Sequence, residues 1–136
     1  MSRPLPATSS SRRADERGSA SIELVILLPA LFAVMFLGTQ AALFYHSRTV
    51  AIAAAQEGAR AAGAEYGKES DGVQAAYEFI SDAGGADVLS SARTTATRTP
   101  TDVTVTVTGR SLSVIPGWNP VITQSASLPV ERLTAP

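Results

Sequence analysis

The feature that most constrains this chain is a long run of uncharged, mostly apolar residues near its N-terminus. From Leu24 to Ser47, 24 consecutive residues contain no Asp, Glu, Lys or Arg. At about 1.5 Å per helical residue this run is about 36 Å long, and the hydrocarbon core of a bilayer is about 30 Å thick. The run therefore predicts a transmembrane helix, which we assign to residues 19–47. Pro29 lies early in it, where it is expected to kink the helix rather than end it.

Basic residues are concentrated on the N-terminal side of this run. Residues 1–18 contain four arginines together with serines and prolines, and they show no apolar periodicity. This composition predicts a disordered basic leader. On the other side, Arg48 is the one basic residue that follows the run closely. The positive-inside rule therefore predicts a single-pass protein with a cytoplasmic N-terminus and an extracytoplasmic C-terminus.

The segment after the run, residues 48–85, predicts a helical stalk outside the membrane. Small residues recur on it at steps of four, which would place them on one helix ridge where another helix or a sheet can approach closely. These residues are Ala51, Ala55, Ala59, Gly63 and Gly67. Alanine-rich sequence can also produce such a ridge by chance. Within the same segment, Gly72 to Ala83 predicts a second, short helix that ends at Gly84-Gly85.

The last part of the chain, residues 86–136, predicts a β-rich tail. Asp102 to Thr108 strictly alternates valine and threonine after its first residue, which would place the valines on one face of a strand and the threonines on the other. Ser and Thr make up 12 of the 24 residues from Ser90 to Ser113. That richness also fits a disordered, glycosylated stalk, but the strict alternation favours a sheet.

Turn residues divide this tail into a predicted antiparallel β-meander. A type II′ turn is expected at Gly109-Arg110, and another turn at Pro116 to Pro120, where Trp118 is either a recognition tip or a local hydrophobic plug. The expected strands are Asp102–Thr108, Arg93–Thr99 before it, Ser111–Ile115 after it, and Val121–Leu128, which Pro129 restricts to a sheet edge. The predicted fold class is α+β: a long transmembrane helix with a helical stalk, a short second helix and a small β-meander.

Composition excludes most catalytic and metal chemistry. The chain has 136 residues, no cysteine and a single histidine, His46, which lies at the expected membrane boundary. Pairs of carboxylates such as Glu57 with Glu65, or Glu69 with Asp71, sit among polar residues and fit a solvated face. There is no glycine-rich phosphate loop, and 11 Lys plus Arg give no basic surface for nucleic acid. We therefore expect no enzyme activity, cofactor, metal or small-molecule substrate.

Glu23 directly precedes the uncharged run, and a carboxylate in the middle of a membrane helix costs about 2.5–3.5 kcal/mol. An acid here needs a partner or a function. One interpretation is that a protease at the cytoplasmic face cuts between Gly18 and Ser19, because Gly18 has no side chain to obstruct an active site. The cut creates an ammonium group at Ser19, about one helical turn from Glu23. That amine, or a neighbouring subunit's, would neutralise the carboxylate and set the register between helices.

Two other interpretations of the N-terminus stay open. A twin-arginine export signal would use Arg12-Arg13 and a cleavage site at Thr39-Gln40-Ala41, but Asp15 and Glu16 follow the arginines where apolar residues are expected. The run is also longer than the 7–15 apolar residues, roughly, of an export signal. A plain signal anchor would leave Glu23 at the membrane interface without a function. Either alternative describes an envelope protein with a small β-rich domain.

These features together resemble a known family, the TadE-like pseudopilins of the bacterial tight adherence (Tad/Flp) pilus machinery. The resemblance covers nearly the whole chain after Arg17. It is carried by Gly18, Glu23, Pro29 within Leu27–Leu31, the alanine-rich Gln56–Ala61, the valine and threonine strand, and the closing Pro129–Arg132. The resemblance implies a pilin-like fold and a minor, low-copy component that helps to initiate or regulate assembly of the major pilin. A major Flp pilin has little beyond its helix, whereas Ser19 to Pro136 is 118 residues.

The resemblance also implies partners. They are a dedicated aspartyl prepilin peptidase, other pilins and pseudopilins, the inner-membrane platform proteins of the Tad system with their cytoplasmic ATPase, and the lipid bilayer of a bacterial cell membrane. Two features depart from relatives of the family. Ser19 stands where classical type IV pilins have an aromatic residue, so N-methylation is not implied, and the cysteine pair of some relatives is missing.

Overall fold

A computed structural model of the chain describes the backbone of residues 12–134 and the side chains from Gly18 onward. The chain divides into two units with the boundary between Leu37 and Gly38. Helix α1, Arg12–Gly63, runs through this boundary. Because α1 begins at Arg12, the expectation of a disordered leader is wrong for residues 12–18, which are helical; residues 1–11 lie outside the described part.

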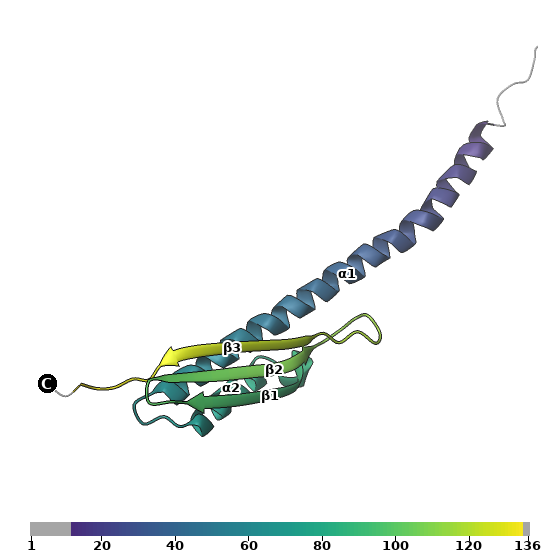
Figure 1. Cartoon of the computed structure of the whole chain (residues 1–136). Coiled ribbons are helices and arrows are strands. Elements are labelled where there is room, and N and C mark those ends of the chain that lie inside the picture. Colours follow the sequence, from purple (N-terminus) through teal and green to yellow (C-terminus); the bar gives the residue numbers. More distant parts are fainter. Residues whose placement is uncertain (1–11, 135–136) are drawn as a thin grey trace, which may run out of the picture. The chain divides into compact units, whose positions relative to one another are not determined.

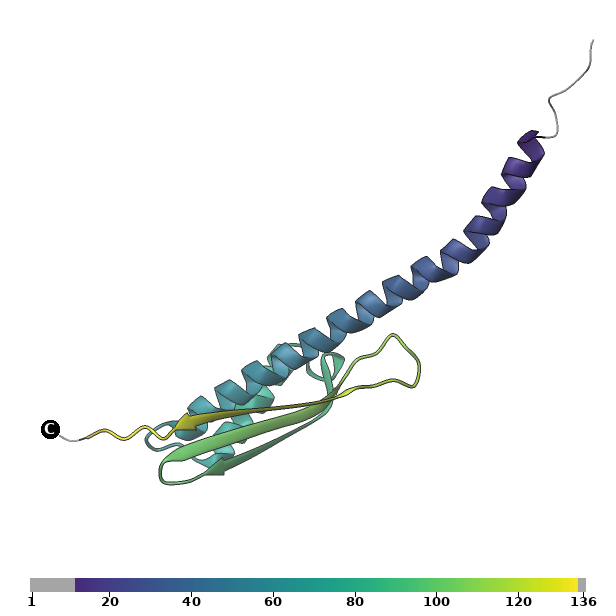
Figure 2. The same ribbon diagram turned by 45° about the horizontal axis from the view of Figure 1, so that its top comes forward.

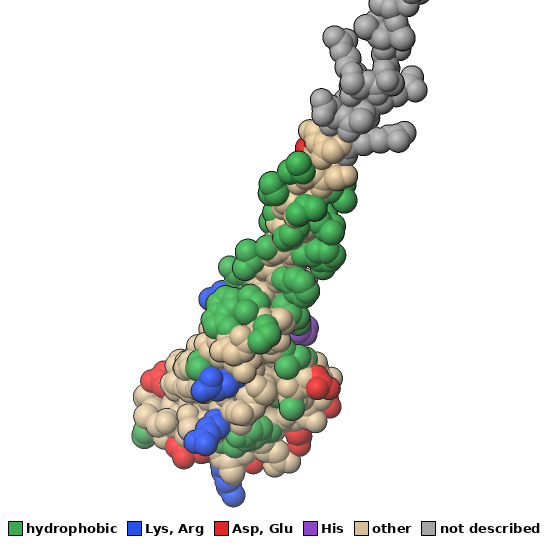
Figure 3. Space-filling view, turned by 90° about the vertical axis from the view of Figure 1, so that its right-hand side faces the viewer, with side chains coloured by type: hydrophobic (Ala, Val, Ile, Leu, Met, Phe, Trp, Pro, Cys, Tyr) green, Lys and Arg blue, Asp and Glu red, His purple; other side chains and the backbone are tan. Residues whose placement is uncertain are grey.

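The first unit is the N-terminal part of α1. Every residue from Gly18 to Thr39 is exposed, including all of the large apolar side chains. Figure 3 shows hydrophobic side chains covering the helix, while charged side chains gather on the α+β domain. A helix that is apolar on all sides is stable when lipid or protein covers it. Within the described residues, one helix is long and apolar enough to cross a membrane, and it spans Gly18–Gly63.

The second unit is a small α+β domain, which confirms the predicted fold class. After α1 come α2 (Glu69–Asp82), the short 3₁₀ helix η1 (Gly85–Asp87), and strands β1 (Leu89–Arg98), β2 (Asp102–Ser111) and β3 (Val121–Pro129). The strands form one antiparallel sheet in the order β1-β2-β3. The C-terminal part of α1 and helix α2 lie on the same face of this sheet (Figures 1 and 2).

The core forms between the small residues of α1 and the valines of β2. Val103, Val105 and Val107 are fully buried, as the alternation predicts. The alternate threonines of β2 lie on the opposite face, where the hydroxyls of Thr104 and Thr106 bond those of Ser127 and Ser125, both at 2.7 Å. The buried apolar residues are Val50, Ala51, Ala54, Ala55, Ala59, Ala62, Ala76, Ile80, Leu89, Val103, Val105, Val107 and Ile122.

Helix α2 starts three residues before the predicted Gly72. The Asp71 carboxylate accepts a hydrogen bond from the Lys68 backbone N–H at 2.8 Å, which fixes the first turn of the helix. Glycine at position 72 therefore lies inside the helix rather than at its start. Its role there is packing against α1, as described below.

The expected hairpin at Gly109-Arg110 is wrong. Strand β2 continues through both residues to Ser111, so Ser111–Ile115 is not a separate strand. A Cβ at Gly109 would lie 2.5 Å from Cγ of Leu89. Gly109 is thus required for the close packing of Leu89 on the sheet and not for a turn. The tight turn instead joins β1 to β2 at Thr99, whose backbone N–H donates to the Asp102 carbonyl oxygen at 2.8 Å.

Strand β1 carries a β-bulge, where the register shifts between Ser90 and Arg93. Ser91 has φ of 51°, a left-handed conformation that is uncommon for a residue other than glycine. The Tyr77 hydroxyl from α2 lies over the bulge. It accepts a hydrogen bond from the Thr94 N–H at 3.2 Å and donates to the Ala92 carbonyl at 3.3 Å. Tyr77 therefore supplies partners for the backbone that the bulge displaces from the ladder.

Tyr77→Phe is expected to lower the free energy of unfolding by about 1–2 kcal/mol, since two hydrogen bonds to edge-strand backbone are lost while the ring remains. Thermal unfolding of the detergent-solubilised protein measures this. The matched control is Tyr66→Phe, because Tyr66 is 86% exposed and its loss should leave stability unchanged. Equal melting temperatures for the two variants would contradict the role given to Tyr77.

Candidate processing and assembly site

The predicted cleavage site lies on the exposed part of α1. Gly18 and Ser19 are both exposed, and no atom lies within 4 Å of the position that a Cβ on Gly18 would occupy. Among the described residues, no side chain covers this peptide bond, so a peptidase could reach it. It is also helical, and glycine lowers helix stability by about 1 kcal/mol relative to alanine. A glycine here eases the local unwinding that an extended protease substrate requires.

Glu23 lies four residues after Ser19 on the same helix, a spacing that places the two on one face. Its side chain is exposed, and within the described residues its carboxylate has no hydrogen bond or ion pair. Apolar residues follow it directly, among them Leu24 and Val25, both exposed. The carboxylate thus lies at the edge of a fully apolar surface. It could pair with a cation from outside the described part of the chain.

Pro29 lies inside α1, and the helix continues through it. Proline removes one backbone donor and one intrahelical hydrogen bond but does not end this helix. The kink proposed from the sequence stays a prediction.

The ridge of small residues is packed within the chain itself. Ala51, Ala55 and Ala59 are fully buried, and a Cβ on Gly63 would lie 3.2 Å from Cγ1 of Val103. The face is therefore covered by the protein's own sheet and α2. Gly67 does not belong to the ridge, because α1 ends at Gly63.

The closest contact of the two helices involves a pair of glycines. A Cβ on Gly58 would lie 2.6 Å from the Gly72 carbonyl oxygen and 3.0 Å from Cγ1 of Val105. A Cβ on Gly72 would in turn lie 2.7 Å from Cβ of Ala62 and 2.8 Å from the Gly58 carbonyl oxygen. Neither residue can carry a side chain without moving the helices apart. The sequence places Gly72 only at the start of a helix, because nothing local relates it to a glycine on another helix.

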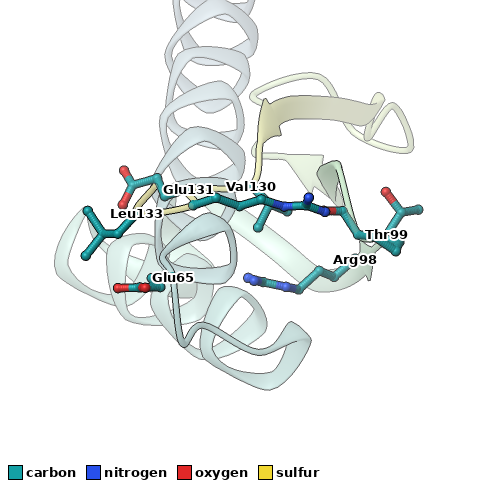
Figure 4. A pocket seen from close by; sticks show the side chains of 8 residues that line it. Glu65, Arg98, Thr99, Val130, Glu131 and Leu133 are labelled. Carbon is teal, nitrogen blue, oxygen red and sulfur yellow. The ribbon is translucent and has the colours of Figure 1, made fainter. Parts of the chain in front are cut away.

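The polar end of the domain holds a shallow hollow of about 400 Å³, lined by Glu65, Arg98, Thr99, Pro100, Val130, Glu131, Arg132 and Leu133. Figure 4 shows Arg98 extending from the end of β1 toward the end of α1. Its guanidinium donates to the carbonyl oxygens of Ala62 and Ala64, the latter at 3.0 Å. Arg98 therefore satisfies the terminal carbonyls of α1 and interacts favourably with the negative end of the helix dipole.

Three of the four carboxylates considered for catalysis have structural partners, and the fourth, Glu65, lines the hollow. Glu57 forms a surface ion pair with Arg60 at 3.3 Å. Glu69 accepts a hydrogen bond from the Arg98 backbone N–H at 2.7 Å, and Asp71 caps α2. His46 is exposed on α1. Among the residues that the structure describes, no group of three or more His, Asp or Glu side chains is placed to hold a metal ion.

The structure defines the class of protein as a small α+β domain with a long N-terminal helix. The helix is exposed and apolar in its N-terminal part, and its C-terminal part belongs to the core of the domain. The model of the TadE-like protein family matches residues 18–60 of this chain. The matched residues lie within α1, begin at Gly18 and make up less than half of the chain. Over these residues the match confirms the resemblance to the TadE-like family. No curated protein and no solved structure shows a significant match.

The family model covers residues 18–60 alone, and among the described residues the one long apolar helix fits a single-pass membrane protein. Gly18, Ser19 and Glu23 all lie within the matched residues, whereas α2 and the sheet lie beyond them.

Proposed function

We propose that this protein is a minor pseudopilin of a bacterial Tad pilus. It is inserted in the cell membrane by the exposed part of α1, is cut between Gly18 and Ser19 by a prepilin peptidase, and promotes pilus assembly through contacts of its helix with other pilins. The observation that carries the proposal is the family match that begins at Gly18, on a helix where Gly18 and Glu23 are both exposed.

The chemistry of the site supplies the mechanism. Cleavage creates an α-ammonium group on Ser19, and the Glu23 carboxylate lies four residues away, about 6 Å along the helix axis. An ammonium from this chain or from a neighbouring subunit pairs with the carboxylate. In a low-dielectric surrounding, an unpaired charge is strongly disfavoured, so the pair forms at one axial offset between helices. The pair therefore specifies the register of assembly.

The burial of the small-residue ridge restricts where these contacts lie. The ridge from Ala51 to Gly63 packs inside the domain, so it does not provide a surface for another subunit. The exposed apolar surface of α1, from Ile22 to Leu37, does. We therefore assign the intersubunit helix contacts to this segment, together with contacts to the platform proteins of the membrane.

The first test is processing. Co-expression with a cognate prepilin peptidase is expected to yield a mature N-terminus at Ser19, read by intact mass and N-terminal sequencing. Gly18→Val should abolish the cut, because a branched side chain then occupies the space at the scissile bond. Gly38→Val, at a second exposed glycine of α1, is the control and should be cut normally. A mature start near Ala42 would instead indicate an export signal, and no cut in the presence of an active peptidase would indicate a plain anchor.

The second test is orientation. A reporter that is active only outside the cytoplasm, fused after Pro136, is expected to be active, because the leader arginines precede the membrane helix and Arg48 alone follows it closely. A cytoplasm-restricted reporter at the same position serves as the control and should be silent. Activity of the second reporter would reverse the proposed topology.

A further inference from the structure

The connection between β2 and β3 is fastened to α1 by one buried glutamine. The side chain of Gln40 is 3% exposed. Its Oε1 accepts hydrogen bonds from the Ser113 hydroxyl at 2.8 Å and the Val114 N–H at 3.0 Å, and its Nε2 donates to the Leu112 carbonyl at 3.4 Å. The loop Leu112–Pro120, visible in Figures 1 and 2 between β2 and β3, is thus held at a defined position along the helix.

This loop exposes apolar side chains and carries no charge. Leu112 is 38% exposed, Val114 37% and Trp118 51%, and residues 111–121 contain no Asp, Glu, Lys or Arg. Trp118 is therefore not the hydrophobic plug that a tryptophan in a turn suggests. The charged residue nearest in sequence is Arg110 at the base of the loop, whose guanidinium donates to the Asn119 carbonyl at 3.4 Å.

Three backbone N–H groups of the loop have hydrogen-bond partners in the loop or on α1. The N–H groups of Val114, Ile115 and Trp118 donate to Gln40, to the Ser113 hydroxyl at 3.0 Å and to the Ile115 carbonyl at 3.2 Å. Pro116 and Pro120 have no N–H to satisfy. The rest of the loop backbone needs water or headgroup oxygens as partners, which the membrane–water interface supplies and the hydrocarbon core does not.

Gln40 lies near the C-terminal end of the predicted membrane-spanning run. A helix needs about 20 apolar residues to cross the hydrocarbon core, and 20 residues counted from Leu24 end at Leu43. Gln40 lies one turn before that point, within the uncharged run. Tyr45, which is 61% exposed, and the exposed Arg48 follow on the helix, and aromatic and basic residues are typical of the membrane–water interface.

We propose that the loop Leu112–Pro120 inserts into the headgroup region of the outer leaflet, with Trp118 as its anchor. The proposal rests on the proposed membrane-spanning role of α1. In this proposal Gln40 fixes the loop at the depth of the interface. The loop in turn supplies hydrogen-bond partners for the Gln40 amide, whose burial in an apolar helix would otherwise cost free energy. Trp118, Leu112 and Val114 cover the lipid side, and Arg110 lies where a lipid phosphate can bind it. The domain is thereby held against the membrane at a second point besides its helix.

Trp118 is the single tryptophan of the chain, so its fluorescence tests the proposal directly. The full-length protein is reconstituted in phosphatidylcholine and phosphatidylglycerol vesicles that carry nitroxide groups either near the headgroup or deep in the acyl chains. We expect a blue-shifted emission compared with tryptophan in water, weak quenching by acrylamide, and quenching by the shallow nitroxide about twofold stronger than by the deep one. Because both leaflets carry the nitroxide, the direction in which the protein inserts into the vesicle does not affect the measured quenching.

Two variants separate the loop from the helix. Gln40→Leu removes the three hydrogen bonds but keeps an apolar helix, and Leu112→Ser with Val114→Ser makes the loop polar. Both are expected to lose the blue shift and the depth preference while remaining in the membrane on carbonate extraction. Tyr66→Phe, far along the chain from the loop, is the control and should behave as the wild type.

The outcomes distinguish this inference from the proposed function. If carbonate extracts the protein from the vesicles, the membrane-spanning role of α1 is overturned. If the protein stays in the membrane but Trp118 emits as in water and acrylamide quenches it strongly, the loop does not contact lipid and the inference is overturned alone. A blue shift that appears only when a purified pilin is added would also overturn it, in favour of a protein contact.

Discussion

A strain in which the only copy of this protein carries Glu23→Gln is expected to process and insert the protein normally but to lose its pili. The carboxylate has no partner within the described part of the chain, and its proposed partner, an α-ammonium group, exists only after cleavage at Gly18. The substitution therefore leaves cleavage intact and removes the attraction that sets helix register. Removing one partner of a buried ion pair costs about 3–5 kcal/mol, which weakens an association by about a hundredfold or more.

Pilus number and the yield of crosslinked partner measure this effect. Glu23→Asp, which keeps the acid on a shorter arm, should restore part of both, and Glu23→Leu should restore neither. The plain-anchor interpretation predicts the reverse for leucine, since removing a carboxylate from the membrane boundary would improve retention. Unchanged pilus number in the Glu23→Gln strain, with the protein shown to be required for pili, would remove the support for this mechanism.

Gly58→Val is expected to disrupt the domain through the contact between α1 and α2. The new Cβ would start 2.6 Å from the Gly72 carbonyl oxygen and 3.2 Å from Cβ of Ala76, and the two further methyl groups have no space to enter. Overpacking of a closed core costs about 1–3 kcal/mol and more where backbone must move, as it must here. A loss of about 3 kcal/mol corresponds to a fall of about 12 °C or more in the melting temperature of a domain of this size.

Thermal unfolding of the domain in detergent measures the loss, and two glycines of α1 provide the comparison. Gly38→Ala is the control, because no atom lies within 4 Å of its Cβ position and alanine is the better helix former; its melting temperature should be unchanged or slightly higher. Gly58→Ala should fall between the control and Gly58→Val, since better helix propensity offsets part of the clash. A Gly58→Val protein as stable as the control would show that the helices do not meet at these glycines.

Features that depend only on neighbouring residues could be predicted from the sequence. The apolar run produces the long helix because its length and lack of charge are properties of consecutive residues. The alternation of valine and threonine produces β2 because a strand places alternate residues on opposite faces, and Val103 and Thr104 are divided in that way. The candidate site at Gly18, Ser19 and Glu23 is local as well, since all three lie on α1, but its role stays a prediction.

Features that depend on residues far apart in the chain were not predictable. Gly109 resembles a turn residue, but Leu89 occupies the space above it, so it lies within β2. Likewise, nothing near Gln40 in the sequence indicates that its amide binds Ser113 and Val114, which lie 73 and 74 residues away.

Sequence alone therefore determined the long helix and the strands that became β1, β2 and β3, because local pattern and intrinsic backbone preference decide them, although it also predicted a fourth strand that does not form. Only the tertiary structure decided which face of α1 is covered. Glycines 58 and 72 meet, and Gln40 binds the loop, because folding brings distant segments into van der Waals contact and every buried polar group must then find a partner. The surface left exposed runs from Gly18 to Thr39, and it is there that we propose the contacts with the membrane and with other subunits.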